Sequence, residues 1–275
     1  SIGSSLQASY VMQDKAQAKL ENALTSDPLE KPYNDDGTIN PNLGNNVYNL
    51  LLNYEPGVYE NHVNNFKAYV NPYIEIRPIK GLSILSRAGI WMNYSNNYKF
   101  DGIGSVNYTY VHPGIAKAQI KQDRKYGYQW DNVLTYNFKF KDHDFTFTGV
   151  STWKYDQEQK TQMDQTNISS NDFKWHNMKG DANTKAESSY SMTKTFGFIG
   201  RINYSYLGRY LFSASIRRDG ASVLYKNNRW DNFPAASAAW RISDESFMES
   251  TQSWLDNLKL RVGWGVTGSA SIKPY

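Results

Sequence analysis

The four histidines of this sequence are the residues best suited to acid–base or metal chemistry, but their spacing favours neither. They are His62, His112, His143 and His176. None stands in an H-E-x-x-H pattern or in another spacing that brings two imidazoles to one metal ion. The chain has no cysteine, which excludes disulfides and thiolate ligands. We therefore expect solvated histidines, no metal site and no cofactor.

The aspartate and glycine clusters favour turns over ligand sites. Asp35-Asp36-Gly37 and Asp219-Gly220 lack the run of oxygen ligands that a calcium loop needs. Gly263 and Gly265 are two isolated glycines, which give room in a strand or allow it to kink. The sequence has neither a G-x-S-x-G elbow nor a phosphate-binding loop. Because no acid–base pair or activated nucleophile is visible, we predict that the protein is not an enzyme.

Three aromatic residues could bind a ligand by stacking. The rings of Trp153, Tyr155 and Trp175 could lie against the rings of a sugar. The alternative for Trp153 and Tyr155 is an aromatic girdle at a membrane surface. The alternative for Trp175 is simple packing within a loop. Both interpretations stay open at this point.

The composition suits a protein that is apolar on one side and wet on the other. Aromatic residues make up 15% of the 275 residues, although hydrophobic residues reach only 40% and the mean hydropathy is −0.67. No run of about 18 apolar residues exists, so no transmembrane helix is expected. Strands of about 10 residues can cross a bilayer without such a run. The net charge of +4 includes no clustered basic stripe, so we expect no nucleic-acid partner.

Alternation with period two dominates the chain and predicts strands. In the clearest case, Leu258, Leu260, Val262, Trp264 and Val266 fall on one face, opposite charged residues and glycines. Helical patterns are confined to 14–24 and 243–255. We predict nine strands, at about 1–12, 63–77, 82–93, 130–140, 145–155, 187–206, 209–218, 233–242 and 258–267.

The connections between these strands alternate in length. Short links are expected at 78–81, 141–144 and 207–209, and long polar links at 13–62, 94–129 and 156–186. Outer-membrane barrels have this asymmetry. Because short and long links alternate along the chain, the link 243–257 should be short, but it is not. Soluble β-sandwiches also alternate, but their strands are typically five or six residues long. We therefore predict an all-β fold, a transmembrane antiparallel β-barrel.

The polar face of these strands would line a wet lumen. Its mid-strand residues include Arg201, Asn203, Arg217, Lys259 and Arg261, which we predict to face the inside of the barrel. The opposite face, with its Leu, Val, Phe and Trp side chains, would contact lipid.

The last quarter of the chain resembles SusC/RagA-type TonB-linked outer-membrane proteins, which are TonB-dependent receptors. An ordered succession of blocks carries the resemblance, and Pro78 to Leu82 and Pro32 to Gly37 add weaker matches. The blocks are Phe198 to Tyr204, Gly208 to Ser215, Arg217 to Ser222, Asn228 to Trp230, Phe233 to Ser243, Leu258 to Arg261 and Gly265 to Gly268.

The resemblance implies a large barrel of about 22 strands with a plugged lumen. Residues 1–275 would then be part of the barrel domain, without the plug domain, the TonB-contacting segment and the remaining strands. Nine strands alone leave two open edges, which lipid does not tolerate. The five lumen-facing residues would contact the plug by salt bridges and hydrogen bonds.

The function implied is active import of a bulky nutrient, a glycan, oligosaccharide or peptide, across the outer membrane of a Gram-negative bacterium of the Bacteroidota. The inner-membrane protein TonB would drive it, and a surface lipoprotein of the SusD type would cap the barrel. Two alternatives stay open. One is a passive porin or an adhesin on a barrel scaffold. The other is a soluble all-β carbohydrate-binding protein, which would be recovered without detergent.

Overall fold

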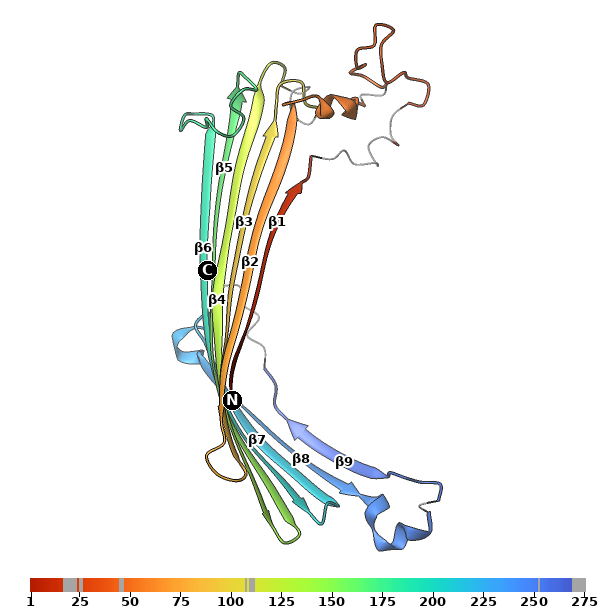
Figure 1. Ribbon diagram of the computed structural model, residues 1–275, viewed down its shortest axis with the longest axis vertical. Helices are drawn as coiled ribbons and strands as arrows, with labels where there is room; N and C mark the ends of the chain where they lie inside the picture. The colour runs from red at the N-terminus through yellow and green to blue at the C-terminus, as the bar shows by residue number, and fades with distance from the viewer. Residues whose placement is uncertain are drawn as a thin grey trace.

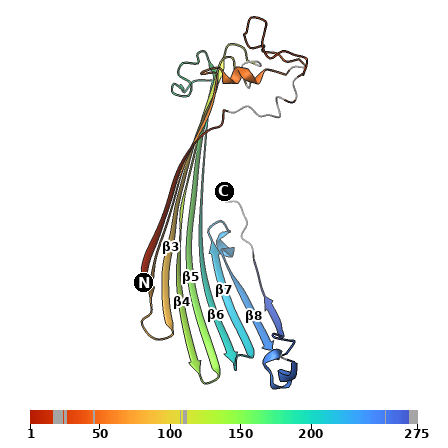
Figure 2. The same cartoon turned by 45° about the vertical axis from the view of Figure 1, so that its right-hand side comes forward.

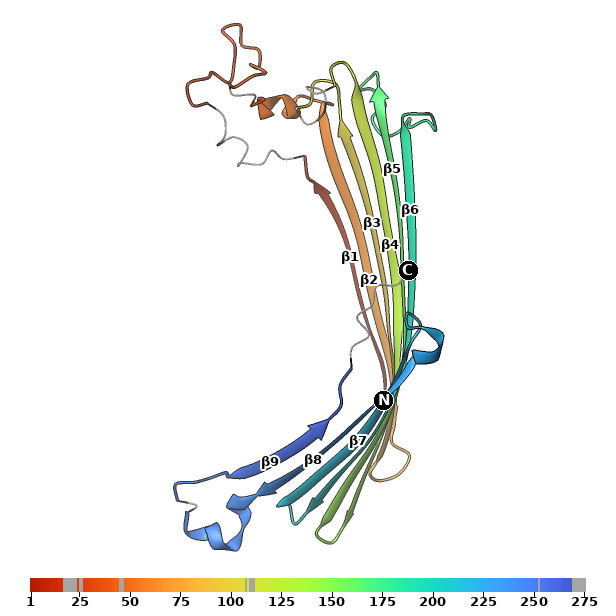
Figure 3. The same cartoon turned by 180° about the vertical axis from the view of Figure 1, so that it is seen from behind.

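The computed structural model describes residues 1–16, 24, 27–44, 47–106, 108, 112–251 and 253–268. Nine antiparallel strands form one sheet, in which each strand pairs with its neighbours in sequence (Figure 1). The sheet is a single curved layer, as the turned views show (Figures 2 and 3). The strands are β1 (Ile2–Asp14), β2 (Tyr59–Ile76), β3 (Leu82–Asp101), β4 (Ala116–Phe140), β5 (His143–Ile168), β6 (Thr184–Tyr206), β7 (Tyr210–Ala221), β8 (Trp230–Arg241) and β9 (Lys259–Gly265).

All nine predicted strands are present, but several are longer than predicted. β4 and β5 have 25 and 26 residues. They extend into 94–129 and 156–186, which the sequence suggested were loops. On the polar face, the added strand segments are rich in Lys, Asp and Gln, and on the other face Gln, Thr and Arg stand among scattered apolar residues. Without a regular series of apolar residues on one side, alternation of hydrophobicity cannot reveal a strand.

The α-helix expected over 243–255 is wrong. The segment forms two 3-10 helices, η3 (Ile242–Asp244) and η4 (Ser246–Thr251). Its backbone bonds, from Glu245 N–H to the Ile242 carbonyl and from Met248 N–H to the Glu245 carbonyl, close three-residue turns.

Other helical segments are short as well. The described residues also contain η1 (Leu50–Tyr54) and η2 (Lys226–Asn228). The expected helix over 14–24 lies largely outside the described residues, and Asp14 itself ends β1. No helix in the described part of the chain is long and apolar enough to cross a membrane.

One register runs through the whole sheet and sorts its side chains onto two faces. Residues directly opposite each other on neighbouring strands point the same way. Trp130 on β4 pairs with Trp153 on β5, which pairs with Phe196 on β6. The same series reaches Leu260 and Val262 on β9 through Trp240 and Ala238 on β8. We call this side the apolar face and the opposite side the polar face.

Within the described residues, no second protein layer covers the apolar face. Val262 and Trp264 are 68% and 64% exposed. Along β4, the apolar face is mostly apolar from Tyr126 to Phe140. At about 3.3 Å per residue and a tilt of about 45°, this band rises roughly 33 Å, close to the hydrocarbon thickness of a bilayer. An exposed apolar surface of this extent needs a cover other than water.

The two ends of the sheet differ. Tight turns at 77–81, 141–142 and 207–209 join strands at the tight-turn end, at the bottom of Figure 1. The described parts of the long connections 15–58 and 102–115, together with the connection 169–183, lie at the loop end, at the top. This confirms the predicted alternation of short and long links.

Aromatic rings mark both edges of the apolar band. At the tight-turn end, His143, Tyr206, Tyr210 and Trp240 form a row with successive centroid distances of 4.8, 6.2 and 6.5 Å. At the loop end, the Tyr155 ring lies 5.5 Å from Tyr128 and 5.7 Å from Tyr126. Two aromatic rows at the edges of an apolar band are typical of barrels that cross a membrane.

The main packed cluster of buried residues lies at the loop end, above the band. Phe100, Ala116 and Ala118 are fully buried there. Asn171 ties the connections together, because its amide accepts a bond from Ile103 N–H and donates one to the Ile103 carbonyl, at 2.7 and 3.1 Å. The loops therefore form a small folded layer on top of the strands.

Candidate functional site on the polar face

The five residues predicted to face a lumen all lie on the polar face. Arg201 pairs with Ser215, and Arg217 pairs with Phe233. Asn203, Lys259 and Arg261 share the same side of their strands and line one hollow of about 220 Å³ near the tight-turn end. The sheet thus brings three of the five predicted residues together.

The other two stand apart from that hollow. Arg217 Nε donates to Asp219 Oδ2 at 2.6 Å. Arg201 is exposed on the same face. The hollow itself holds two cations and an amide beside Asp144. Such a group can bind carboxylates or carbonyl oxygens. Contact of these residues with a plug stays a prediction.

A buried carboxylate higher on the polar face was not singled out from the sequence. Asp131 is 7% exposed. It accepts hydrogen bonds from Arg87 Nε at 3.2 Å, Gln129 Nε2 at 3.1 Å and Thr152 Oγ1 at 2.8 Å. The partners come from three adjacent strands, so only the register assembles them. The signal in the sequence is a mid-strand Asp on the polar face.

Trp91 is the one indole on the polar face among the residues of the nine strands, and it interrupts the polar character of that face. Its side chain lies against Gly127 on β4. The ammonium group of Lys154 is 5.9 Å from the ring centroid. Next to it is a hollow of about 760 Å³, whose lining includes Tyr73, Arg87, Trp91, Gln129 and Asp131. Rings beside hydrogen-bond donors can hold a sugar or a peptide.

The three aromatics predicted to stack on sugars are not on this face. Trp153 and Tyr155 lie on the apolar face at the loop-end edge of the band, where the girdle interpretation applies. Trp175 packs in the connection 169–183, with its ring 5.7 Å from Tyr98 and 5.6 Å from His62. This packing agrees with the loop alternative. Sugar contact by the three residues stays a prediction.

Polar contacts of the isolated motifs are local. His143 Nδ1 lies 2.8 Å from the Tyr204 hydroxyl, and His62 Nε2 lies 3.3 Å from Glu60. Asp36 accepts bonds from the Thr38 hydroxyl and N–H, which lower the pKa of its carboxyl and close a turn. In the described ranges, no three His, Asp or Glu residues are arranged to hold a metal ion.

Glu245 connects the segment between β8 and β9 to the aromatic row at the tight-turn end. Its carboxylate accepts bonds from the Tyr210 hydroxyl at 2.7 Å, Trp240 Nε1 at 2.9 Å and an Arg209 guanidinium nitrogen at 3.1 Å. The bond from Tyr210, followed by that from Trp240, lowers the pKa of Glu245. The side chain is 11% exposed. These three hydrogen bonds therefore fix the start of the connection to the sheet.

Comparison with known proteins gives one consistent group of relatives. TonB-dependent receptor P26 of Formosa agariphila is 27% identical over 273 residues, which are 97% of this chain and 27% of the relative. TonB-dependent receptor P3 of the same organism is 30% identical over 88% of this chain and 24% of the relative. TonB-dependent receptor SusC of Bacteroides thetaiotaomicron is 42% identical over 93 residues, 34% of this chain and 9% of SusC. No family model matches the chain.

Solved structures agree on the fold. A chain of the RagAB peptide transporter matches with a TM-score of 0.81 and 18% identity, over 100% of this chain and 31% of that one. The RagAB peptide importer in its closed-closed state gives a TM-score of 0.80 and 19% identity, with the same coverage. This chain spans about a quarter of the length of the curated relatives above. The comparisons confirm both the family resemblance and the antiparallel barrel fold.

Proposed function

Because this chain is a stretch of β-barrel wall similar to that of SusC/RagA-type TonB-dependent receptors, we propose that its protein imports a bulky nutrient across the outer membrane. The energy comes from TonB, and the location is the outer membrane of a Gram-negative bacterium of the Bacteroidota. Residues 1–275 contribute wall to the barrel domain. The plug domain, the TonB-contacting segment and the other strands belong to the rest of the protein.

The division of the sheet into two faces carries this proposal. The apolar face is exposed over a band that fits a bilayer, with aromatic rings at both edges. The polar face holds most of the charges, many of them paired, as between Arg87 and Asp131. A wall with lipid on one side and water on the other favours a transporter over a soluble carbohydrate-binding protein. The loop end is then extracellular and the tight-turn end periplasmic.

The cargo is a glycan, an oligosaccharide or a peptide. The structurally similar RagAB complex is a peptide transporter, which supports the peptide alternative. A SusD-like surface lipoprotein over the loop end would complete the importer. The hollow beside Trp91 offers a ring, a guanidinium and an amide to such a cargo on its way through the lumen.

Uptake by the full-length protein in its own outer membrane tests the proposal. The probes are a fluorescein-labelled maltodextrin and a fluorescein-labelled mixture of tryptic peptides. We expect uptake of at least one probe that disappears when the gene, TonB or the proton-motive force is removed. Uptake that persists without TonB and without the proton-motive force would identify a passive porin. Recovery of the full-length protein without detergent would contradict a membrane location.

A further inference from the structure

The cations on the apolar face are distributed differently from those on the polar face. On the polar face most cations pair with a described carboxylate, among them Arg87, Lys125 and Arg217, although Lys259 and Arg261 do not. By register, the apolar face carries Arg124 on β4, Lys194 on β6 and Arg218 on β7. None of the three forms an ion pair with a described residue. Across the nine strands, the acidic residues on the apolar face are Asp14 and Glu60, both at loop-end termini of strands.

Two of these cations and a third from the neighbouring connection surround one hollow. Lys194 and Arg229 line a depression of about 420 Å³ at the loop-end edge of the apolar band. The Arg218 guanidinium lies next to it, 5.5 Å from the centroid of Trp230, another lining residue. The connection from β7 to β8, residues 222–229, contains no acidic residue. The hollow therefore has an uncompensated positive charge.

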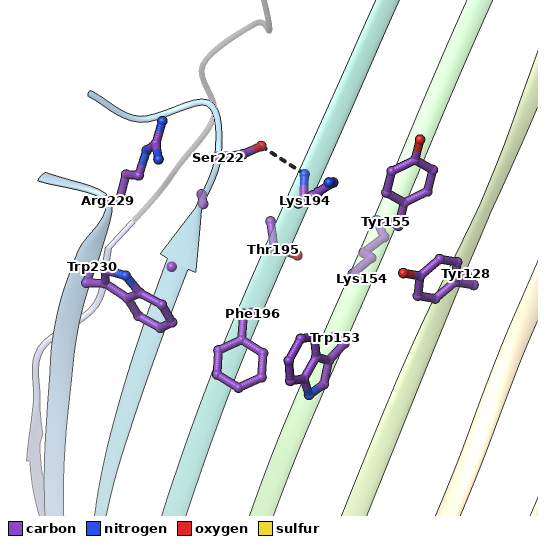
Figure 4. A pocket seen from close by; sticks show the side chains of 12 residues that line it. Tyr128, Trp153, Lys154, Tyr155, Lys194, Thr195, Phe196, Ser222, Arg229 and Trp230 are labelled. Carbon is purple, nitrogen blue, oxygen red and sulfur yellow. Dashed lines mark hydrogen bonds between the residues drawn. The ribbon is translucent and has the colours of Figure 1, made fainter. Parts of the chain in front are cut away.

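The floor of this hollow is aromatic. Phe196 lies edge-on to Trp153 and to Trp230, with centroid distances of 4.4 and 5.7 Å. Figure 4 shows the Lys194 and Arg229 side chains toward the loop end, with these three rings below them. Rings below and cations above repeat the order of acyl chains and headgroup in a lipid leaflet.

A hydroxyl completes the polar rim. Lys194 N–H donates to Ser222 Oγ at 2.9 Å (Figure 4). The Ser222 hydroxyl proton has no acceptor among the described residues, so it can be donated to a bound oxygen. Guanidinium, ammonium and hydroxyl donors together suit a phosphate, because arginine binds phosphate oxygens in pairs and lysine adds a point charge.

We propose that this hollow binds the phosphate headgroup of an anionic lipid in the outer leaflet. Lys194, Arg218 and Arg229 neutralise the phosphate, Ser222 donates a hydrogen bond, and the acyl chains lie along Phe196 and the band below it. The inference rests on the proposed function in one respect, namely that the sheet spans the outer membrane with its loop end outside. Unpaired cations at the edge of hydrocarbon are stabilised by such a partner.

Lipid binding to the full-length protein, purified in neutral detergent, tests the proposal by native mass spectrometry. The probes are dioleoylphosphatidylglycerol, dioleoylphosphatidylcholine and inorganic phosphate. We expect the variant Lys194→Gln/Arg218→Gln/Arg229→Gln to bind phosphatidylglycerol at least about tenfold more weakly than the wild type. The matched control Lys67→Gln/Lys80→Gln/Lys121→Gln loses as many charges from the polar face and a tight turn, and should bind as the wild type does.

Three outcomes would overturn the proposal. They are equal affinity of both triple variants for phosphatidylglycerol, equally tight binding of phosphatidylcholine by the wild type, and occupation of the site by inorganic phosphate as effectively as by lipid. Heat-modifiable mobility in gels checks folding, and if the triple variant does not fold, Lys194→Gln and Arg229→Gln singly make the same test. Because binding is read without import, a protein that binds lipid but imports nothing would refute only the proposed function.

Discussion

The indole of Trp91 lies so close to Gly127 on the neighbouring strand that a Cβ at position 127 would come within 2.5 Å of the ring. The same Cβ would meet the Tyr155 carbonyl oxygen at 2.4 Å. The glycine thus makes room on the polar face for the one large indole there, beside the hollow with Arg87 and Asp131. The wall at this point is shaped by a missing side chain on one strand and a large side chain on the next.

The variant Gly127→Ala should therefore destabilise the barrel by about 1–3 kcal/mol, the usual cost of overpacking. The full-length variant should lose its folded, heat-modifiable gel form at a lower temperature than the wild type. Gly149→Ala is the matched control, since Gly149 is also a strand glycine and a Cβ there meets no atom within 4 Å. Equal midpoints for the two variants would show that Trp91 does not rest on Gly127.

The assignment of the two faces can be tested with adjacent residues of β4. Leu134 lies on the apolar face between Ile84 and Gly149, whereas Thr135 lies on the polar face between Ser83 and Thr148. An Arg at position 134 would stand near the middle of the hydrocarbon and should destabilise the barrel by about 2–4 kcal/mol. An Arg at position 135 would stand in water and cost little. The measurement is the urea midpoint of each full-length variant; a larger loss for Thr135→Arg than for Leu134→Arg would reverse the faces.

Glu245 should make the stability depend on acid pH. Its folded pKa is lowered, chiefly by the bond from Tyr210, from an ordinary value of 4.5. The carboxylate therefore stabilises the folded state above pH 4.5, and this contribution is lost as the pH falls through the lower, folded pKa. The variant Glu245→Gln keeps a hydrogen-bond acceptor for Tyr210 and Trp240, but its side chain has no carboxyl group that could titrate.

The measurement is the thermal midpoint of the full-length protein between pH 7 and pH 3. The wild type should lose more stability than Glu245→Gln over the acid part of this range, and the two curves should converge at the lowest pH. Parallel curves would mean that Glu245 is not held as a carboxylate in the folded state.

The strands could be predicted from the sequence wherever one face is apolar. The alternation at Leu258 to Val266 and at Phe196 to Tyr206 follows from contact with hydrocarbon on one side. The same alternation therefore predicts both the strand and the face on which each side chain lies. The loop-end halves of β4 and β5 were missed because both of their faces are wet. There the strand is held by backbone hydrogen bonds, which leave little trace in side-chain polarity.

The sites divide in the same way. The polar-face position of Arg201, Asn203 and Arg261 follows from counting along one strand. The contacts of Asp131 with Arg87 and Thr152 depend on the register in which three strands pair. The register was not readable from any single strand, so neither was the network. Trp91 was missed for a related reason, because a ring on the polar face is explained only by the glycine opposite it.

Arg261 offers the sharpest test of the proposed plug. It shares a hollow with Lys259 and Asn203, and neither cation forms an ion pair with a described residue. If acceptors on the plug neutralise these cations, Arg261→Leu removes a charge-assisted contact that holds the plug against the wall. The full-length variant should then pass small solutes faster than the wild type, measured as swelling of liposomes in a sugar solution or as single-channel current in a planar bilayer. Arg261→Lys keeps the charge and should leak less than Arg261→Leu. Identical leakage of the wild type and Arg261→Leu would place the plug contact elsewhere on the polar face.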